Sequence, residues 1–552
     1  MKIIKLIPTF LLILLSTSGF SQNWIWSQQI GGSQAETCGS NSICHDFDGN
    51  IYMSGTYHSN PCYLLNDTLV SMSGISDFYI AKYDVSGNEL WVKSFGGHNS
   101  TYEFEAISNI IFDSFTNSLF VNGEFYEKCL LGSDTLESRG SSDVFVARLD
   151  LDGNIIWAKQ LGGTGEDLAT AMVVDKNGAV YLSFLLPAGG QIDSLQIIPG
   201  VYFVKLDPNS HLIWAERKFN INTTIDGYDA IVLGLAISDN HLFGIGYCSI
   251  DSFNVDSVKV LTSLHPGQNI LCCMDTNHAT VRWMKTFGSS NPLAMNLSTD
   301  SFKNNFITGS IHNDAIFDDD TLHSSNGNEE LIIAKYDSMG HKQWVKQATS
   351  SVGAYGSCVA LDNEGGAYFT GGIYGTVTLD TFSVNTSVNG DLFIARYNSN
   401  GNCLGFRQVA DGNGSSMLVS DDNKIYINGK FSHSITFGST TTLTSYGQSD
   451  VFLAKCDAIT GVGEELRLAN NQLLIYANPT KGICNVTIPD EFKHEHTLNL
   501  QVFDLGGKLL QESTLEMQGG EIKINLEQEA KGIYNINLSN RTKTYRGKVV
   551  FE

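Results

Sequence analysis

The chain repeats one pattern of residues seven times, and this repetition limits its possible folds more than any other feature. In its clearest form, an apolar stretch opening with aspartate is followed by Asp-x-x-Gly-Asn, a tryptophan and a Gly-Gly pair. The first two apolar stretches are Asp77–Asp84 and Asp143–Asp150. Further copies lie at 202–214, 270–283, 331–344, 391–405 (Gly405 replacing the tryptophan) and 450–457. Self-similarity at such a period indicates a repeat architecture.

A second motif supports the same count. The segment Asp48–Gly55 is echoed at 118–123, 177–183, 241–246, 305–309, 366–371 and 424–429. The tryptophan segments begin near the N-terminus with Trp24–Trp26, before the first copy of the repeated apolar stretch, Asp77–Asp84. The last apolar stretch, 450–457, has no tryptophan after it. The two ends of the repeat region therefore hold complementary parts of one unit.

From this pattern we predict an all-β fold, with a seven-bladed β-propeller over residues 22–462. Strands such as Phe78–Tyr83 are apolar at both alternating positions, which is typical of sheets covered on both faces. A small sheet cannot bury both faces alone, so the units must pack together, and closing them into a ring removes exposed edges. We expect the N-terminal strand to complete the sheet that Asp450–Asp457 begins.

The repeat resembles the bacterial seven-bladed propeller repeats called SBBP. Members of that family carry an apolar strand with aspartate, Gly-Asn-x-Tyr-x-x-Gly as in Gly49–Gly55, and Asp-x-Phe-x-x-Lys as in Asp450–Lys455. An aromatic strand and Gly-Gly follow. The resemblance covers most of the chain, and it implies a fold rather than a function.

Residues 1–21 have the features of a signal peptide. Lys2 and Lys5 form a positive start, and Leu6–Leu15 form a short apolar run. Cleavage after Ser21 would place Gly19 and Ser21 at the two positions that require small residues. The apolar run is too short to span a bilayer, and we predict no transmembrane segment.

The C-terminal region lacks the repeat. We predict a polar linker over 463–472, then a small immunoglobulin-like β-sandwich over 473–552, because short alternating strands recur there. This region resembles the type A C-terminal sorting domain of the type IX secretion system in Bacteroidota. The matching residues are Tyr476, Asn478, Pro479, Gly482, Gly507, Lys508, Gly532, Tyr534 and Lys548, while Ala477 replaces one family proline.

The resemblance implies that the type IX secretion machinery is a partner and that the protein is exported through the periplasm. Its destination would be the outer cell surface or the surroundings of the cell. Charge limits other partners, since 34 basic and 58 acidic residues leave a net charge of −24. Such a body repels nucleic acid, so we predict no nucleic-acid partner.

The search for catalytic and metal-binding patterns leads to no predicted catalytic residue, metal ligand or cofactor. Zinc-helix, nucleophile-elbow and phosphate-loop motifs are missing from the sequence. Asp46–Asn50 and Asp150–Asn154 resemble fragments of calcium loops, but both lack the distal glutamate and lie where hairpin turns are needed. Asp318–Asp320 is the densest acidic cluster. Most of the eleven cysteines occupy apolar strand positions, which favours packing over disulfides.

We therefore expect a non-enzymatic binding or structural module, with an extracellular protein or glycan as its ligand. The alternative is an extracellular hydrolase or lyase with an active site at the mouth of the propeller channel. Paired carboxylates could come together from distant blades, and spacing along the chain does not reveal such a pair.

Overall fold

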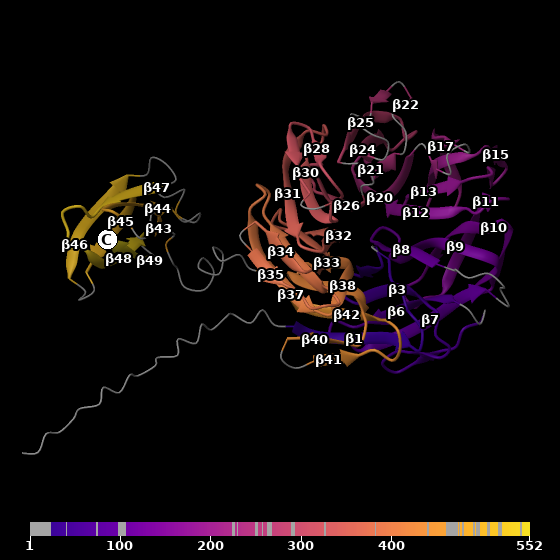
Figure 1. Ribbon diagram of the computed structural model, residues 1–552, viewed down its shortest axis with the longest axis horizontal. Coiled ribbons are helices and arrows are strands. Elements are labelled where there is room, and N and C mark those ends of the chain that lie inside the picture. Colours follow the sequence, from indigo (N-terminus) through magenta and orange to yellow (C-terminus); the bar gives the residue numbers. More distant parts are fainter. Residues whose placement is uncertain are drawn as a thin grey trace, which may run out of the picture. The chain divides into compact units, whose positions relative to one another are not determined.

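The computed structural model describes most of the chain from residue 24 onward. The described residues are 24–39, 41–72, 76–97, 106–222, 227–228, 230–248, 252–256, 258–261, 268–288, 293–324, 327–380, 382–438, 441–459, 473, 475–476, 480–488, 492, 497–504, 508–516, 521–540 and 544–551. The elements named along these ranges, β1 to β49, are all strands (Figure 1). The predicted all-β class is confirmed. The predicted signal peptide, 1–21, and linker, 463–472, lie outside the described residues.

Up to Asp457, the described strands form seven antiparallel groups of four, which we number sheets one to seven. The first three are β2 (Ile43–His45), β3 (Ile51–Tyr57), β6 (Asp77–Tyr83), β7 (Glu89–Gly97); β8 (Ala106–Asp113), β9 (Ser118–Leu131), β10 (Asp134–Leu149), β11 (Ile155–Gly163); and β12 (Leu168–Val174), β13 (Val180–Leu186), β16 (Gly200–Leu206), β17 (Leu212–Phe219). Each runs from an inner first strand to an outer fourth strand.

The other four sheets follow the same order. They are β20 (Ala230–Ser238), β21 (His241–Cys248), β24 (Gln268–Asp275), β25 (Val281–Phe287); β26 (Leu293–Thr299), β27 (Asn305–Ile311), β30 (Glu330–Tyr336), β31 (Lys342–Ser350); β32 (Gly353–Leu361), β33 (Ala367–Tyr374), β36 (Asp391–Tyr397), β37 (Cys403–Ala410); and β38 (Gly412–Val419), β39 (Lys424–Phe431), β42 (Asp450–Asp457), β1 (Trp24–Gly32). Sheet seven thus takes its fourth strand from the N-terminal end of the described chain.

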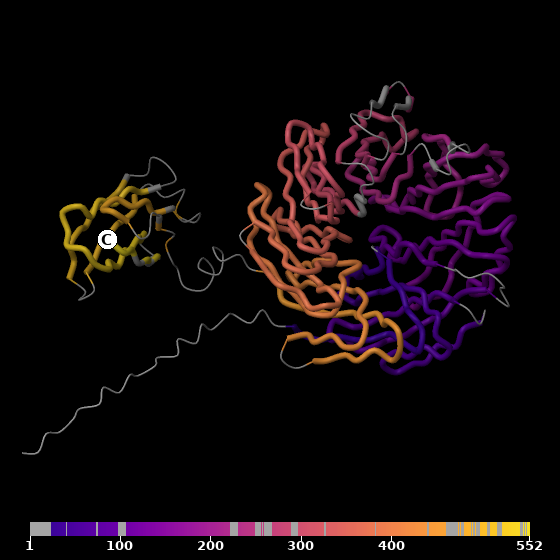
Figure 2. Tube along the Cα trace, in the orientation of Figure 1, coloured from indigo at the N-terminus to yellow at the C-terminus, as the bar shows by residue number. Residues whose placement is uncertain are grey.

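The seven sheets close into a ring. Their first strands, β2, β8, β12, β20, β26, β32 and β38, contact one another in sequence, and β38 returns to β2. The N-terminal strand β1 pairs antiparallel with β42, with Ile30 opposite Val451, as expected from the split repeat. Figure 2 shows this closure, where the indigo start of the chain lies beside the orange end of the propeller. The predicted β-propeller is confirmed, and its bounds, 22–462, remain a prediction.

Short outer hairpins account for the length of the repeats, and in sheet two this hairpin is the outer end of β9 and β10, where Leu131 lies opposite Asp134. The other six are separate hairpins. They are β4 (Cys62–Tyr63) with β5 (Thr68–Leu69), β14 (Gly190–Ile192) with β15 (Leu195–Ile197), β22 (Ser252–Val255) with β23 (Val258–Leu261), β28 (Ala315–Phe317) with β29 (Asp320–Leu322), β34 (Thr376–Leu379) with β35 (Phe382–Asn385), and β40 (Ser434–Phe437) with β41 (Thr441–Thr444). A further short pair is β18 (Ile221–Asn222) with β19 (Gly227–Tyr228). Several of these hairpins pair with the fourth strand of the preceding sheet: Gly162 lies opposite Gln191, and Gly31 opposite Tyr63. The Gly-Gly ends therefore tie neighbouring sheets together.

The repeated tryptophan also joins neighbouring sheets. Trp157 Nε1 of sheet two donates a hydrogen bond of 3.0 Å to the carbonyl of Pro208, in the last turn of sheet three. Arg148, in the repeat's Lys/Arg position, donates to the same carbonyl at 3.2 Å. Sheet seven contacts sheet one in the same way, through Trp26 and Lys455. The repeated spacing of aromatic and basic residues along the chain thus builds an inter-sheet clamp.

In sheets one and two, the glycine of the Asp-x-x-Gly-Asn turn between the third and fourth strands fits beneath the tryptophan of the preceding sheet. Gly153 has a φ of +74°, and a Cβ there would lie 2.7 Å from the ring of Trp91 in the preceding sheet. Glycine satisfies both demands, because it adopts positive φ without strain and has no side chain to collide with the ring.

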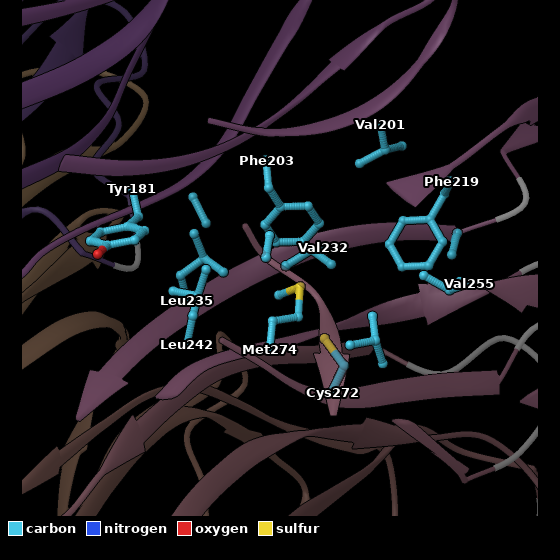
Figure 3. Packing of buried hydrophobic residues seen from close by; sticks show 14 of the residues in the cluster. Tyr181, Val201, Phe203, Phe219, Val232, Leu235, Leu242, Val255, Cys272 and Met274 are labelled. Carbon is cyan, nitrogen blue, oxygen red and sulfur yellow. The ribbon is translucent and has the colours of Figure 1, made fainter. Parts of the chain in front are cut away.

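The apolar core is divided into layers between successive sheets. Figure 3 shows the layer between sheets three and four, where Tyr181, Phe203 and Phe219 face Leu242 and Met274. In β6 all seven residues are buried, which confirms that both faces of this strand are covered. All eleven cysteines are free thiols, and eight of them are buried.

The chain divides into two compact units, of which the smaller consists mainly of residues 459–552. Its described strands form two sheets around one apolar core: β43 (Ile475–Tyr476), β44 (Ile483–Thr487) and β47 (Glu521–Asn525) in one, and β46 (Leu509–Glu516), β45 (Thr497–Phe503), β48 (Gly532–Ser539) and β49 (Thr544–Phe551) in the other. The immunoglobulin-like topology remains a prediction. Within the described residues, no helix has the length and apolarity needed to cross a membrane.

Candidate functional site

The first strands of the seven sheets surround a cavity of about 890 Å³ on the axis of the ring. It opens at the end where the strand one–strand two turns lie, beside Phe47, Asp48, Asp421 and Asp422. Its walls are mostly apolar and come from alternate positions of the inner strands. They include Ile111, Met172, Val173, Leu235, Leu297 and Val359.

Asparagine side chains form a floor beneath this cavity. Asn41 Nδ2 donates to Asn109 Oδ1 at 3.2 Å, and Asn296 Nδ2 of sheet five donates to Asn41 Oδ1 at 3.1 Å. Asn41 leads into the first strand of sheet one, and sheet five lies on the other side of the ring. The second of these bonds therefore crosses the axis of the ring. Asn296 Oδ1 also accepts from the backbone N–H of Val359 in sheet six, at 3.2 Å.

The floor separates the large cavity from a smaller one of about 360 Å³. The smaller cavity is lined by Ala106–Ser108 at the start of β8, whereas the large cavity is lined by Ile110–Phe112 further along the same strand. Asn109 lies between these two sets of residues. The large cavity is therefore a blind pocket that opens at one end of the ring.

Sequence reasoning missed the floor, although a signal for part of it exists. Asn109 and Asn296 each stand four residues before a turn aspartate, Asp113 and Asp300. The register of each inner strand shifts just before these asparagines. A β-bulge re-aims the side chain that follows it. The partner Asn41 lies outside that pattern, so only the closed ring reveals the bond across the axis.

The carboxylate of Asp46, at the cavity wall, is engaged in hydrogen bonds within its own hairpin turn. Its Oδ1 accepts from the backbone N–H of Asp48 at 3.0 Å and of Asn50 at 2.9 Å, and its Oδ2 accepts from Tyr52 Oη at 2.9 Å. Burial alone would raise the pKa of Asp46, but these hydrogen bonds and the charge of Lys82 outweigh burial and lower the pKa. The carboxylate is therefore a turn-capping group.

The cavity thiols are held in their protonated form. Burial raises the pKa of Cys358 to about 11, and burial also raises the pKa of Cys44. A thiol becomes a good nucleophile only as the thiolate. These two cysteines serve as small apolar wall residues.

The acidic segments that resemble calcium loops are engaged in local contacts. Asp150 Oδ1 accepts from the backbone N–H groups of Asp152 and Asn154, at 3.0 Å and 2.8 Å, as the turn interpretation expects. In the acidic cluster, Lys342 binds Asp319 and lies 2.6 Å from Asp320. Within the described ranges, no group of three or more His, Cys, Asp or Glu side chains is placed to hold a metal ion.

Three of the nine predicted sorting residues, Asn478, Pro479 and Gly507, lie outside the described residues. The other six are spread over the smaller unit. Tyr476 is in β43 opposite Asn485, Lys508 precedes β46, and Lys548 of β49 lies opposite Asn535.

The remaining three sorting residues have structural roles in their immediate surroundings. Gly482 has a φ of +125°, a conformation that favours glycine, and its position leaves room for Glu527. Tyr534 is buried, and its hydroxyl donates to the carbonyl of Ala530. Gly532 begins β48 opposite Phe551. The predicted set is thus distributed along the fold of the domain.

Comparison with known families agrees with both parts of the chain. Residues 474–552 match the model described as "Secretion system C-terminal sorting domain", and residues 25–60 match "Beta-propeller repeat". The chain therefore carries a type IX sorting domain, which indicates export by that system, and propeller repeats.

Similar proteins are distant. An uncharacterized WD repeat-containing protein of Acanthamoeba polyphaga mimivirus is 29% identical over 156 residues, which span 26% of this chain and 11% of that protein. Among solved structures, the Neurospora crassa Pan2 WD40 domain is 9% identical, with a TM-score of 0.41, covering 80% of this chain and 99% of that one. The Dos1 propeller is also 9% identical, with a TM-score of 0.37, covering 80% and 96%.

Proposed function

We propose that this protein is an exported, non-enzymatic binding protein whose ligand occupies the blind cavity of the propeller. The type IX machinery would deliver it, by way of residues 474–552, to the outer cell surface or into the surroundings of the cell. The observation that carries the binding role is the cavity itself: about 890 Å³, closed below by asparagines and open above. Mostly apolar concave sites with a few polar groups are typical ligand sites.

The chemistry of the walls supports binding rather than catalysis. A hydrolase acting on glycans needs a carboxylic acid with a raised pKa close to a second carboxylate. At this cavity the pKa of Asp46 is lowered and its oxygens accept hydrogen bonds within the turn. A thiol nucleophile would need a lowered pKa, and the pKa of Cys358 is raised.

A bulky substitution at the cavity wall tests the binding role. Ser298 lines the cavity, while Ser301 lies in the following turn and does not. We expect Ser298→Trp to abolish binding of ligands found by screening glycans and peptides, and Ser301→Trp to leave binding intact. Turnover of a polymer by the wild type, lost in Ser298→Trp, would instead establish the hydrolase or lyase alternative.

Removal of residues 474–552 tests the export route. We expect the truncated chain to accumulate inside the cell envelope of the native host, while the full chain reaches the surface or the medium. Fractionation followed by intact-mass analysis measures both. Equal export of the two chains would contradict the proposed route.

A further inference from the structure

The mouth of the cavity carries negative charge on one side. Asp48, in the strand one–strand two turn of sheet one, and Asp421 and Asp422, in the equivalent turn of sheet seven, line the cavity and are exposed. These sheets are neighbours across the closure of the ring. The opposite wall, formed by sheets three to five, is apolar near Val173, Leu235 and Leu297.

These three carboxylates differ from Asp239 and Asp457 at the same end of the ring, which are paired with lysines. Lys303 pairs with Asp239 at 3.3 Å, and Lys424 pairs with Asp457 at 2.9 Å. In the part of the chain that the structure describes, no ion pair involves Asp48, Asp421 or Asp422. These three carboxylates, which we call the acidic lip, therefore present charge that a ligand can neutralise.

Among the described residues, the cavity lysine Lys455 forms no ion pair with the lip, although the charge of Asp422 attracts its ammonium group, like that of Lys424. Lys455 lines the cavity but is buried, and its Nζ donates to the carbonyl of Val85 at 3.0 Å. It belongs to the inter-sheet clamp, and its ammonium lies 4.8 Å from the centre of the Tyr426 ring. Burial lowers the pKa of Lys455.

An exposed aromatic ring lines the cavity next to the acidic lip. The side chain of Phe47, next to Asp48, is 74% exposed, and its ring meets Phe112 edge to face at 5.2 Å between centroids. Both rings line the cavity. Phenylalanine at the crest of a hairpin turn is unfavourable in water, whereas a ring beside carboxylates can take a cation on its face.

From this arrangement we propose that the ligand is a basic peptide segment of another protein. An apolar side chain of that segment enters the cavity, and flanking lysine or arginine side chains contact Asp48, Asp421 and Asp422 at the lip. The inference rests on the proposed binding function and specifies its ligand class. The net charge of −24 favours the same choice, because it draws cationic partners and repels acidic ones.

Labelled synthetic peptides test the proposal on the purified protein. The probe is a blocked five-residue peptide with leucine between two lysines, and the comparison peptides replace leucine by serine or both lysines by glutamates. We expect binding of the first peptide by fluorescence anisotropy, weaker binding of the second and none of the third. Binding should weaken as salt is raised, since exposed charges are screened.

Charge-removing variants locate the contact. We expect Asp48→Asn and Asp422→Asn each to weaken binding of the lysine peptide about two- to five-fold, as for exposed ion pairs, and the two together about ten-fold. Asp152→Asn is the matched control, because Asp152 is an exposed turn carboxylate that does not line the cavity. Its affinity should equal that of the wild type.

The outcomes separate this inference from the proposed function. If a neutral oligosaccharide binds, Ser298→Trp abolishes that binding and the lysine peptide does not bind, the cavity is a binding site but the ligand class proposed here is wrong. If the lysine peptide binds equally well to Asp48→Asn/Asp422→Asn, the acidic lip is not its contact and the inference fails. If neither peptides nor oligosaccharides bind, both proposals fail.

Discussion

The propeller and the C-terminal unit are both built from antiparallel strands, but their parts depend on each other in different ways. In the propeller, every apolar layer lies between two sheets, and the ring is closed by residues more than 400 positions apart, such as Gln29, whose Nε2 lies 2.5 Å from Asp450 Oδ2. In the smaller unit, a single core is formed within about eighty residues. A sheet of the propeller therefore has no core of its own.

This difference predicts which changes destabilise each region. Loss of one propeller strand removes a partner from the layers on its two sides, so the damage spreads around the ring. Loss of a side chain in the smaller unit is confined to that unit. Four predictions test the contrast, from the largest expected effect to the smallest.

Deletion of Trp24–Gly32 should have the largest effect, because it opens the ring and exposes the edge of β42. We expect the propeller to lose its cooperative unfolding transition while the smaller unit keeps its own. Differential scanning calorimetry of the deleted and intact chains measures both. A propeller transition that persists at the same temperature would show that closure by β1 is dispensable.

Ile536→Ala should affect only the smaller unit. Ile536 is fully buried in β48, and removal of such a side chain typically costs about 2–5 kcal/mol through lost burial and the cavity left behind. We expect the calorimetric transition of the smaller unit to shift down and that of the propeller to stay unchanged. A matching shift in the propeller would contradict the separation of the two units.

Glu36→Gln should stabilise the propeller at alkaline pH. Glu36 is fully buried next to the ring closure, and burial raises its pKa to about 7, with Asp450 adding to the effect and hydrogen bonds from Ser59 opposing it. Because the folded-state pKa lies above the unfolded value near 4.5, the stability contributed by the protonated form is lost as pH rises from about 4.5 through 7.

The free energy of unfolding of the variant should therefore exceed that of the wild type by about 3 kcal/mol at pH 8 and by little at pH 4. Denaturant unfolding at the two pH values measures the difference. Glu137→Gln, at an exposed position, is the control and should show no such dependence. Equal effects of Glu36→Gln at both pH values would contradict a raised pKa.

Trp157→Phe should have the smallest effect. The substitution removes the bond from Nε1 to the carbonyl of Pro208 but keeps a ring and leaves Arg148 on the same carbonyl. We expect a loss of about 1 kcal/mol, the usual net value of one hydrogen bond, measured by denaturant unfolding. Trp157→Phe combined with Arg148→Met should cost more than the sum of the two single changes, since the carbonyl then has no donor from sheet two.

The sequence determined the parts of this protein that recur. Strand identity, the hairpin turns at Asp150–Asn154, and the split unit that joins Trp24–Gly32 to Asp450–Asp457 follow from periodicity and turn chemistry, which act over a few residues. The sorting domain was predictable for a different reason, because the sequence itself contains the motif residues of that family. Arg148 occupies the basic position of the repeat, and its bond to Pro208 shows that it joins neighbouring sheets.

Only the tertiary structure decided what happens on the axis of the ring. Asn41 and Asn296 are 255 residues apart, yet they share a hydrogen bond, and Asp48 and Asp422 line one cavity from neighbouring sheets. No spacing along the chain encodes these meetings, because they depend on the angle through which seven sheets close. Local pattern thus determined the repeated unit, while ring geometry decided which of its irregular residues meet and form the site.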